Sequence, residues 1–356
     1  ETTNSNGEFF LAKDRLKMNH SITVSSPGYL NKTINIPVTM DNMFQVELEK
    51  APIQRVNDAA KVMEIIRTAI RKSRTYYSSK ESFQGYHREV VQINNETYGI
   101  DESAFNYSNS GWAGNPNALK YETVKFKKME DKEGYKLMQL KPNHHSEFYP
   151  LKADVLSVPP EFWQPTSINQ FDYKIIGQIQ YDGETCYKIH FEQNDRLVIP
   201  LQQGILYIGK ETSALRYASW TSTPTKRKYI SYTDFLQSNP LDYQVQINDD
   251  YYEASYAFID GHLRLQATDQ QIHILVDQND ELVFKSRLSI VGQSSREFKN
   301  IQNENSDLLI EDGKGTHMLV KDATYQIAPW VNTGMIKPEE QLIKDARFLH
   351  DIVVYD

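Results

Sequence analysis

The feature that most constrains the fold of this chain is a long region of alternating apolar and polar residues with recurrent turn signals. From residue 84 to about residue 302 the period is two, the period of a β-strand whose faces meet different surroundings. The turn signals are of the kinds that close tight hairpins: Asn94-Asn95, Asp182-Gly183, Asp260-Gly261 and Asn279-Asp280. Consecutive hairpins build an antiparallel sheet, so we expect 84–302 to form a single antiparallel sheet.

One hairpin can be followed strand by strand. The Asp182-Gly183 turn separates Ile175–Ile179 from Thr185–Phe191, and both runs alternate. The chain also contains 22 tyrosines, and tyrosine and phenylalanine favour the half-buried surface of a sheet. We therefore expect a mainly β (α+β) protein.

Shorter strands are expected before this region. His20–Ser25 alternates, Pro27-Gly28 turns the chain, and Thr33–Ile36 alternates again. A further alternating run, Phe44–Leu48, closes the segment. Short strands of this kind belong to a sandwich, so residues 1–50 are predicted to form a small β-sandwich fragment.

A helix is predicted over residues 57–75, within a linker at 51–80. Its apolar residues follow helical spacing and form one stripe: Val62, Ile65, Ile66, Ala69 and Ile70. Asn57 is suited to cap its N-terminus, and basic residues follow at its C-terminal end. The stripe favours packing against a sheet over binding to a partner. A second helix is expected to begin at Pro338.

Two segments interrupt the strand pattern. Residues 108–118 have the composition of a loop. Residues 146–170 contain Pro159-Pro160 and two aromatics that look exposed, Phe162 and Trp163. This second segment is predicted to be either a short helix or a flap across the sheet.

Composition excludes several classes of function. The net charge is −8, whereas a nucleic-acid-binding surface must be basic, and the local run Lys125–Lys128 is balanced by the acids that follow it. The single cysteine, Cys186, excludes an intramolecular disulfide framework and a multi-cysteine zinc site. No apolar run approaches the roughly 20 residues of a membrane-spanning helix.

Several short motifs together resemble a known arrangement of domains. The first resemble the second half of a carboxypeptidase regulatory-like domain, a prealbumin-like β-sandwich with a T-x-x-x-G-x-F-x-L hairpin. The later ones are similar to cell-envelope proteins in which that domain precedes a large β region opened by a G-F-Y-R-E-like motif. In chain order the motifs are Thr3–Leu11, Ile22–Tyr29, Val46–Leu48, Gly85–Glu89, Gly204–Ile208 and Trp330–Glu340.

The resemblance implies a fold and a location. Its β region is similar to the half-barrel of lipoprotein carriers, a curved antiparallel sheet with helices closing the concave side. The implied domains are an incomplete sandwich over 1–50, whose first strands would precede Glu1, the linker helix over 51–80 and the half-barrel over 81–356. The implied location is the periplasm or the periplasmic face of the outer membrane. This chain has Tyr86-His87 where the motif has Phe-Tyr, and no functional residue of the family carries over.

A zinc site is the sharpest enzymatic hypothesis. His144 and Glu147 match the H-x-x-E spacing of zinc carboxypeptidases, and His262 or His273 would have to supply a distant third ligand. The motif specifies few positions, and the expected β surroundings differ from a carboxypeptidase catalytic domain. We instead predict that His144 and Glu147 lie in a surface turn around Pro142-Asn143.

Other catalytic constellations are weaker. Ser110 precedes a glycine in a loop without a nucleophile elbow, and Cys186 shares a strand face with His190 but reads as a small core residue. The acidic pairs Asp101-Glu102 and Asp249-Asp250 are interpreted as turn residues. We therefore expect no catalytic residues, no cofactor and no metal site.

Binding is the remaining class of function. A curved sheet with alternating aromatics offers a concave apolar surface, so the first hypothesis is a non-catalytic envelope protein that binds a lipid, another hydrophobic ligand or a lipoprotein segment there. In the alternative, the protein's own helices and residues 146–170 fill that surface. The chain would then be a structural or protein-interaction module of an outer-membrane assembly. A zinc peptidase is the third and weakest hypothesis.

Overall fold

A large antiparallel sheet dominates the computed structural model, as the turn spacing predicts. The strands of this sheet are β3 (Ser82–Ile93), β4 (Glu96–Ser108), β5 (Lys120–Glu130), β7 (Phe171–Tyr181), β8 (Glu184–Gln193), β9 (Gln202–Gly209), β10 (Leu215–Ser222), β12 (Val245–Ile259), β13 (His262–Val276), β14 (Asp280–Gln293), β15 (Val320–Lys321) and β16 (Asp351–Tyr355). The structure describes residues 20–24, 29, 32–36, 45–49, 59–77, 82–108, 111, 120–130, 140–142, 153–231, 233, 236–239, 242–277, 280–293, 320–321 and 351–355.

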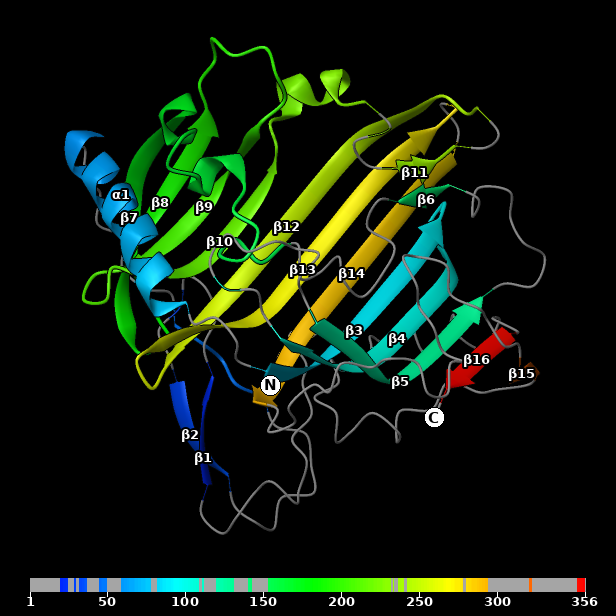
Figure 1. Ribbon diagram of the computed structural model, residues 1–356, viewed down its shortest axis with the longest axis horizontal. Coiled ribbons are helices and arrows are strands. Elements are labelled where there is room, and N and C mark those ends of the chain that lie inside the picture. Colours follow the sequence, from blue (N-terminus) through cyan, green and yellow to red (C-terminus); the bar gives the residue numbers. More distant parts are fainter. Residues whose placement is uncertain are drawn as a thin grey trace.

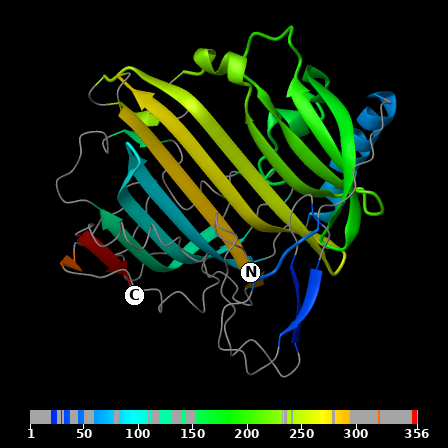
Figure 2. The ribbon, with the colours of Figure 1, turned by 180° about the vertical axis from the view of Figure 1, so that it is seen from behind.

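The strand order joins two hairpin series into one 12-stranded sheet. Across the sheet the order is β15-β16-β5-β4-β3-β14-β13-β12-β10-β9-β8-β7, and every named pairing is antiparallel. The sheet is strongly curved (Figures 1 and 2). The mainly β prediction is therefore confirmed, although residues 294–302 lie outside the described part of the chain.

The predicted tight turns are present where they are described. Asn94 and Asn95 have φ of 50° and 69°, Asp182 and Gly183 have 47° and 80°, and Asp260 and Gly261 have 52° and 81°. Positive φ at both central residues defines the type I′ turn, whose twist matches that of the flanking strands. Asn279 lies outside the described residues, and β14 begins at Asp280.

The N-terminal region contains a separate hairpin. β1 (His20–Val24) pairs antiparallel with β2 (Lys32–Ile36), as predicted, and this hairpin lies outside the large sheet (Figure 1). The third predicted strand is wrong, because the described residues Gln45–Leu48 carry no strand. They are held by the Lys32 Nζ, which donates to the carbonyl of Glu47 at 3.0 Å. The sandwich over 1–50 stays a prediction.

The linker helix crosses one end of the sheet, as its apolar stripe predicts. Helix α1 (Ala59–Tyr76) buries Val62, Ile66, Ala69 and Ile70 and contacts β7, β10 and β13 (Figure 1). The Leu215 N–H donates to the Ser73 hydroxyl at 3.0 Å, which ties the last part of the helix to β10. We call the face of the sheet that carries α1 the inner face. Asn57, the expected cap, lies outside the described residues.

The remaining elements are short. They are the 3₁₀ helices η4 (Glu161–Trp163), η5 (Ile168–Gln170) and η6 (Pro224–Tyr229) and the paired strands β6 (Lys141–Pro142) and β11 (Leu236–Ser238). None of the helices in the described part of the chain has the length and hydropathy needed to cross a membrane. A curved sheet with a helix on its inner face matches the half-barrel architecture that the resemblance implies. The loop expected at 108–118 and the helix expected from Pro338 fall outside the described residues, apart from Ser108, which ends β4, and Gly111.

Candidate functional site

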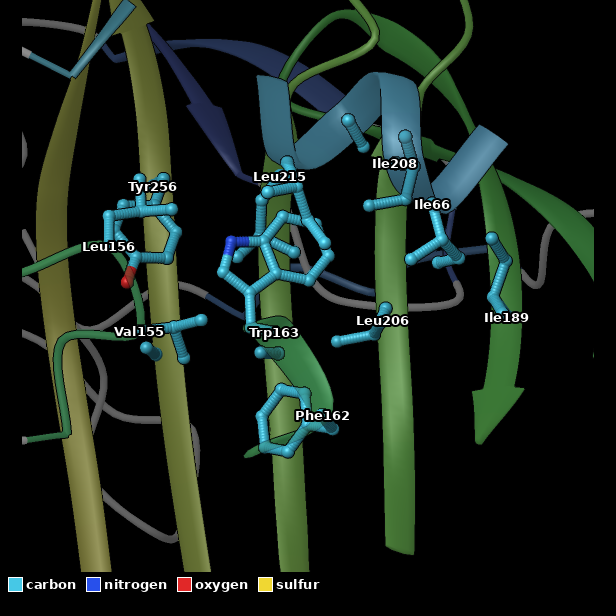
Figure 3. Close-up of a cluster of buried hydrophobic side chains, with 14 of the residues drawn as sticks. Ile66, Val155, Leu156, Phe162, Trp163, Ile189, Leu206, Ile208, Leu215 and Tyr256 are labelled. Carbon is cyan, nitrogen blue, oxygen red and sulfur yellow. The ribbon is translucent and has the colours of Figure 1, made fainter. Parts of the chain in front are cut away.

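A segment of the chain occupies the inner face where a hydrophobic ligand was expected. Residues 153–170, which we call the plug, lie over the sheet beside α1 and contain η4 and η5 (Figure 3). Phe162 and Trp163 are both 0% exposed, so the expectation that they are exposed is wrong. They turn inward because large aromatic side chains gain most from burial against the apolar strands below them. Both sequence alternatives for 146–170 hold in part over the described residues 153–170, since the plug is a flap that contains short helices; residues 146–152 lie outside the described part.

Aromatic rings fix the plug against the sheet. The Phe162 ring stacks on Phe191 of β8 with centroids 4.3 Å apart and lies 5.4 Å from Trp220 of β10. It also meets Phe171 edge to face at 6.5 Å. The Tyr173 hydroxyl donates to the carbonyl of Phe162 at 2.6 Å. The inner face over β7–β13 is therefore a packed core.

Hydrogen bonds to a buried carboxylate attach the start of the plug to the rest of the fold. Asp154 accepts hydrogen bonds from the hydroxyls of Tyr77, just after α1, and of Tyr256 on β12, the latter at 2.7 Å. The Leu156 N–H also donates to it, at 3.1 Å. Burial raises the pKa of Asp154 above its ordinary value, because desolvation penalises the charged form more than these hydrogen bonds favour it. The same burial raises the pKa of Tyr256. One residue thus joins plug, helix end and sheet.

A belt of polar side chains runs across neighbouring strands and divides the inner face into two parts. Gln270 on β13 lies opposite Ser286 on β14, which in turn lies opposite Glu89 on β3, and all three are buried. Two residues along β14 on either side, Leu288 belongs to the core under the plug and Phe284 to a second core near β6 and β11. Residues two apart on a strand share a face. The inner face is therefore two apolar cores with polar groups between them.

The acidic pairs expected at turns lie inside strands instead, so that prediction is wrong. Asp101-Glu102 is in β4, where the buried Glu102 accepts a hydrogen bond from Arg88 Nε at 2.8 Å. Asp249-Asp250 is in β12, where the buried Asp250 accepts from the Ser222 hydroxyl at 2.6 Å and the Thr221 hydroxyl at 2.8 Å. Their hydrogen-bonding partners lie on neighbouring strands, which the local turn-like composition did not reveal. Both carboxylates have structural partners on the sheet.

The candidate zinc ligands are not brought together by the described residues. His262 and His273 both lie on β13, eleven positions apart, and a strand that rises about 3.3 Å per residue separates them by roughly 35 Å. His273 Nδ1 lies 3.2 Å from the Glu281 carboxylate. In the part of the chain that is described, no group of three or more His, Cys, Asp or Glu side chains is placed to hold a metal. His144, Glu147 and Ser110 lie outside it. Of the surface turn predicted around Pro142-Asn143, only Pro142 is described, and it lies in β6, paired with Leu236; the placement of His144 and Glu147 stays a prediction.

Cys186 is a core residue, as the sequence predicts. It is 0% exposed and packs with Ile179, Tyr207 and Tyr217 on the outer face of the sheet. Burial raises the pKa of its thiol to about 12, and the nearby Glu184 carboxylate adds to this rise. Alternation along β8 puts His190 on the same face four residues away, but a thiol with so high a pKa is not a nucleophile at neutral pH.

We expect the native protein to resist alkylation at Cys186. At pH 8 iodoacetamide should label the thiol only after denaturant is added, because burial both blocks access and suppresses the thiolate. Intact-mass measurement with and without urea checks this, since the chain has a single cysteine. Rapid labelling of the folded protein would show that Cys186 is reactive and would reopen the question of nucleophilic chemistry.

Sequence reasoning missed a second buried charge cluster. Arg216 on β10 is 2% exposed, and its guanidinium lies 3.1 Å from the carboxylate of Glu184 at the start of β8. Glu184 also accepts the N–H groups of Glu211 and Thr212, at 2.9 and 2.8 Å. The cluster therefore fixes the β9–β10 turn against the start of β8. No local pattern could reveal it, because the partners come from different hairpins.

Comparison with known proteins gives little further guidance. No protein-family model and no curated protein matches this chain. It is similar to a DUF1329 family protein from Desulfovibrio piger (TM-score 0.26, 12% identity, 64% of this chain and 92% of that one). It is also similar to a LolA superfamily protein from Nitrosomonas europaea (TM-score 0.25, 8% identity, 66% of this chain and 95% of that one). A third similar structure is MucB in complex with MucA(peri) (TM-score 0.18, 8% identity, 66% of this chain and 94% of that one). Likenesses at these TM-scores carry no argument about function, which rests on the side chains described above.

Proposed function

We propose that this chain is a non-catalytic interaction module, a half-barrel that is closed by its own helix and plug and acts through its outer surfaces. The observation that carries the proposal is the complete burial of Phe162 and Trp163 against the strands of the inner face. Hydrophobic ligands bind in concave apolar sites, and here side chains of the chain itself fill that place. The domain division at 1–50, 51–80 and 81–356 and a location in the cell envelope are parts of this proposal that rest on the sequence resemblance.

The chemistry of the described residues supports the non-catalytic part. Asp154, Asp250, Glu102 and Glu184 are each engaged by hydrogen bonds that hold neighbouring segments together. Burial suppresses the thiolate of Cys186. Catalytic groups instead stand in a cleft beside a space for substrate. These side chains therefore stabilise the fold.

Carriage of a lipid or another hydrophobic ligand on the inner face is the competing function. One observation favours it: the plug is a separate segment, and its start is joined to the helix end and the sheet through one carboxylate, Asp154. A ligand would have to displace Phe162 and Trp163 and then meet the polar belt of Gln270, Ser286 and Glu89. A continuous acyl chain gains nothing from such a belt.

Native mass spectrometry of protein purified without detergent distinguishes the two functions. For a closed half-barrel we expect the mass of the chain alone, with no lipid or fatty acid retained under gentle ionisation. The denatured mass gives the baseline, and a lipid extract of the same sample checks for material lost in the gas phase. One lipid per chain would overturn the closed inner face and favour the carrier.

A further inference from the structure

Exposed apolar side chains gather at one end of the half-barrel. Val198 is 64% exposed, Ile199 53% and Tyr229 52%, and these are three of the five exposed large hydrophobic residues in the described part of the chain. Val198 and Ile199 lie in the loop between β8 and β9, and Tyr229 ends η6. Both views show the loop and η6 projecting from the same end of the sheet (Figures 1 and 2). We call residues 194–201 and 224–229 together the rim.

The loop of the rim is held in one conformation from below. Gln193 is 4% exposed, and its side-chain amide donates to the carbonyls of Leu197 at 3.1 Å and Ile199 at 2.6 Å. Its side-chain oxygen accepts the N–H of Leu201 at 2.9 Å. A buried side chain thus fixes the backbone on both sides of Val198. The loop therefore presents Val198 and Ile199 to solvent on a preorganised support, which lowers the entropic cost of binding.

The rim also carries basic side chains that the fold does not use. Arg227 is committed to the sheet, since its guanidinium lies 2.7 Å from the Asp249 carboxylate. The flanking Lys226 and Lys228 have no carboxylate partner among the described residues, and the Lys228 Nζ lies 5.0 Å from the centre of the Tyr229 ring. On the loop, the exposed Arg196 is next to the exposed Asp195, so these two charges offset each other. The rim therefore has an apolar loop and a basic η6, in a chain whose net charge is −8.

We propose that the rim docks this protein on an anionic membrane surface. Val198 and Ile199 enter the interface between headgroups and acyl chains, while Lys226 and Lys228 bind lipid phosphates. Surface attachment needs both an apolar contribution and an electrostatic one, and the rim supplies both on one projecting edge. The inference deepens the proposed function by naming the surface and its partner, and it rests on that function.

The shape of the rim and its two most exposed residues favour a membrane over an acidic protein. The exposed aliphatic residues stand on a projecting loop, which can enter a soft interface. At protein interfaces valine and leucine are under-represented among the residues that carry the binding energy, whereas tryptophan, tyrosine and arginine are enriched. The most exposed residues here, Val198 and Ile199, are aliphatic. An acidic protein partner is therefore an outcome of the test that would overturn the proposal.

Vesicle co-sedimentation of the full chain tests the proposal. We expect binding to vesicles of phosphatidylcholine with phosphatidylglycerol, weaker binding to phosphatidylcholine alone, and a decrease when salt is raised. The double variants Val198→Asn/Ile199→Asn and Lys226→Glu/Lys228→Glu should each lower the partition coefficient by about tenfold. Matched controls at the opposite end, Ile259→Asn and Lys210→Glu, should bind like the unmodified protein.

Insertion is read separately with Val198→Trp, whose added fluorescence should be quenched by vesicles of brominated lipid. Absence of vesicle binding, or equal binding by the Lys226→Glu/Lys228→Glu variant, would overturn the proposal. Binding to polyglutamate without binding to vesicles would overturn it in favour of an acidic protein. The failures are distinguishable, because retained lipid in native mass spectrometry contradicts the closed inner face, whereas failed co-sedimentation contradicts only the docking surface.

Discussion

Replacing Trp163 with alanine is expected to lower the free energy of unfolding by about 3–5 kcal/mol, the usual cost of emptying a large buried aromatic site. Trp163 is 0% exposed and lies in η4 at the centre of the plug core (Figure 3). The cavity would be lined by α1, the plug and the strands beneath, so no single element can collapse into it. Urea unfolding followed by circular dichroism measures the change.

Two controls separate packing from other causes. The indole Nε1 of Trp163 has no hydrogen-bond partner among the described residues, so Trp163→Phe keeps much of the ring and should cost about 1 kcal/mol. Tyr229→Ala removes an aromatic that is 52% exposed and should change stability by less than about 0.5 kcal/mol. If Trp163→Ala were as stable as Tyr229→Ala, the plug would not be packed as described. Such a result would also contradict the proposal that the plug closes the inner face.

Replacing Asp154 should have an effect that depends on both the new side chain and the pH. Asp154→Ala removes the acceptor for the hydroxyls of Tyr77 and Tyr256 and should cost about 3 kcal/mol, because hydrogen bonds to a buried acceptor are lost. Asp154→Asn keeps a carbonyl acceptor and removes the charge. It should therefore be much less harmful near neutral pH.

The pH dependence follows from the raised pKa of Asp154. Burial holds the folded-state pKa above the ordinary 3.8, so the native state binds the proton more tightly than the unfolded state. Protonation of Asp154 therefore stabilises the folded state. This stabilisation is fully present below about pH 3.8 and is lost as the pH rises through the folded-state pKa. Because Asp154→Asn lacks this titration, its stability relative to the unmodified protein should increase between pH 4 and pH 8. Urea unfolding across that range measures it, and the opposite slope would mean that hydrogen bonding outweighs desolvation at this carboxylate.

Local sequence signals predicted the parts of the fold that local physics determines. The Asp182-Gly183 and Asp260-Gly261 turns were visible because only a few residue types adopt positive φ readily. The α1 stripe was visible because helical spacing places Val62, Ile66 and Ala69 on one side. Cys186 was placed in the core by strand alternation alone. Each of these signals is contained within a few residues.

The inner face could not be predicted in this way, because its contacts join residues that are distant in sequence. Phe162 and Trp163 follow two prolines in an irregular segment, and no local signal indicates that Phe191 and Trp220 will pack against Phe162. Asp154 finds its partners at Tyr77 and Tyr256, far away on either side. The rim was missed for a different reason, since the sequence around Val198-Ile199 looks like the beginning of a strand. Val198 and Ile199 are exposed because hydrogen bonds from the Gln193 side chain fix the backbone of the loop.

The pairing of β3 with β14 affects how the protein can be made. Residues 82–93 lie beside residues 280–293, so the middle of the sheet joins after almost all of the described chain has been synthesised. Before that, β3–β5 and β7–β13 can form only as separate hairpin series with unprotected edges. Closing so long a loop is entropically slow, and contacts of this range give low folding rates. The nascent chain therefore has a long interval in which its two half-sheets are open to aggregation, and its yield should depend on chaperones that cover strand edges.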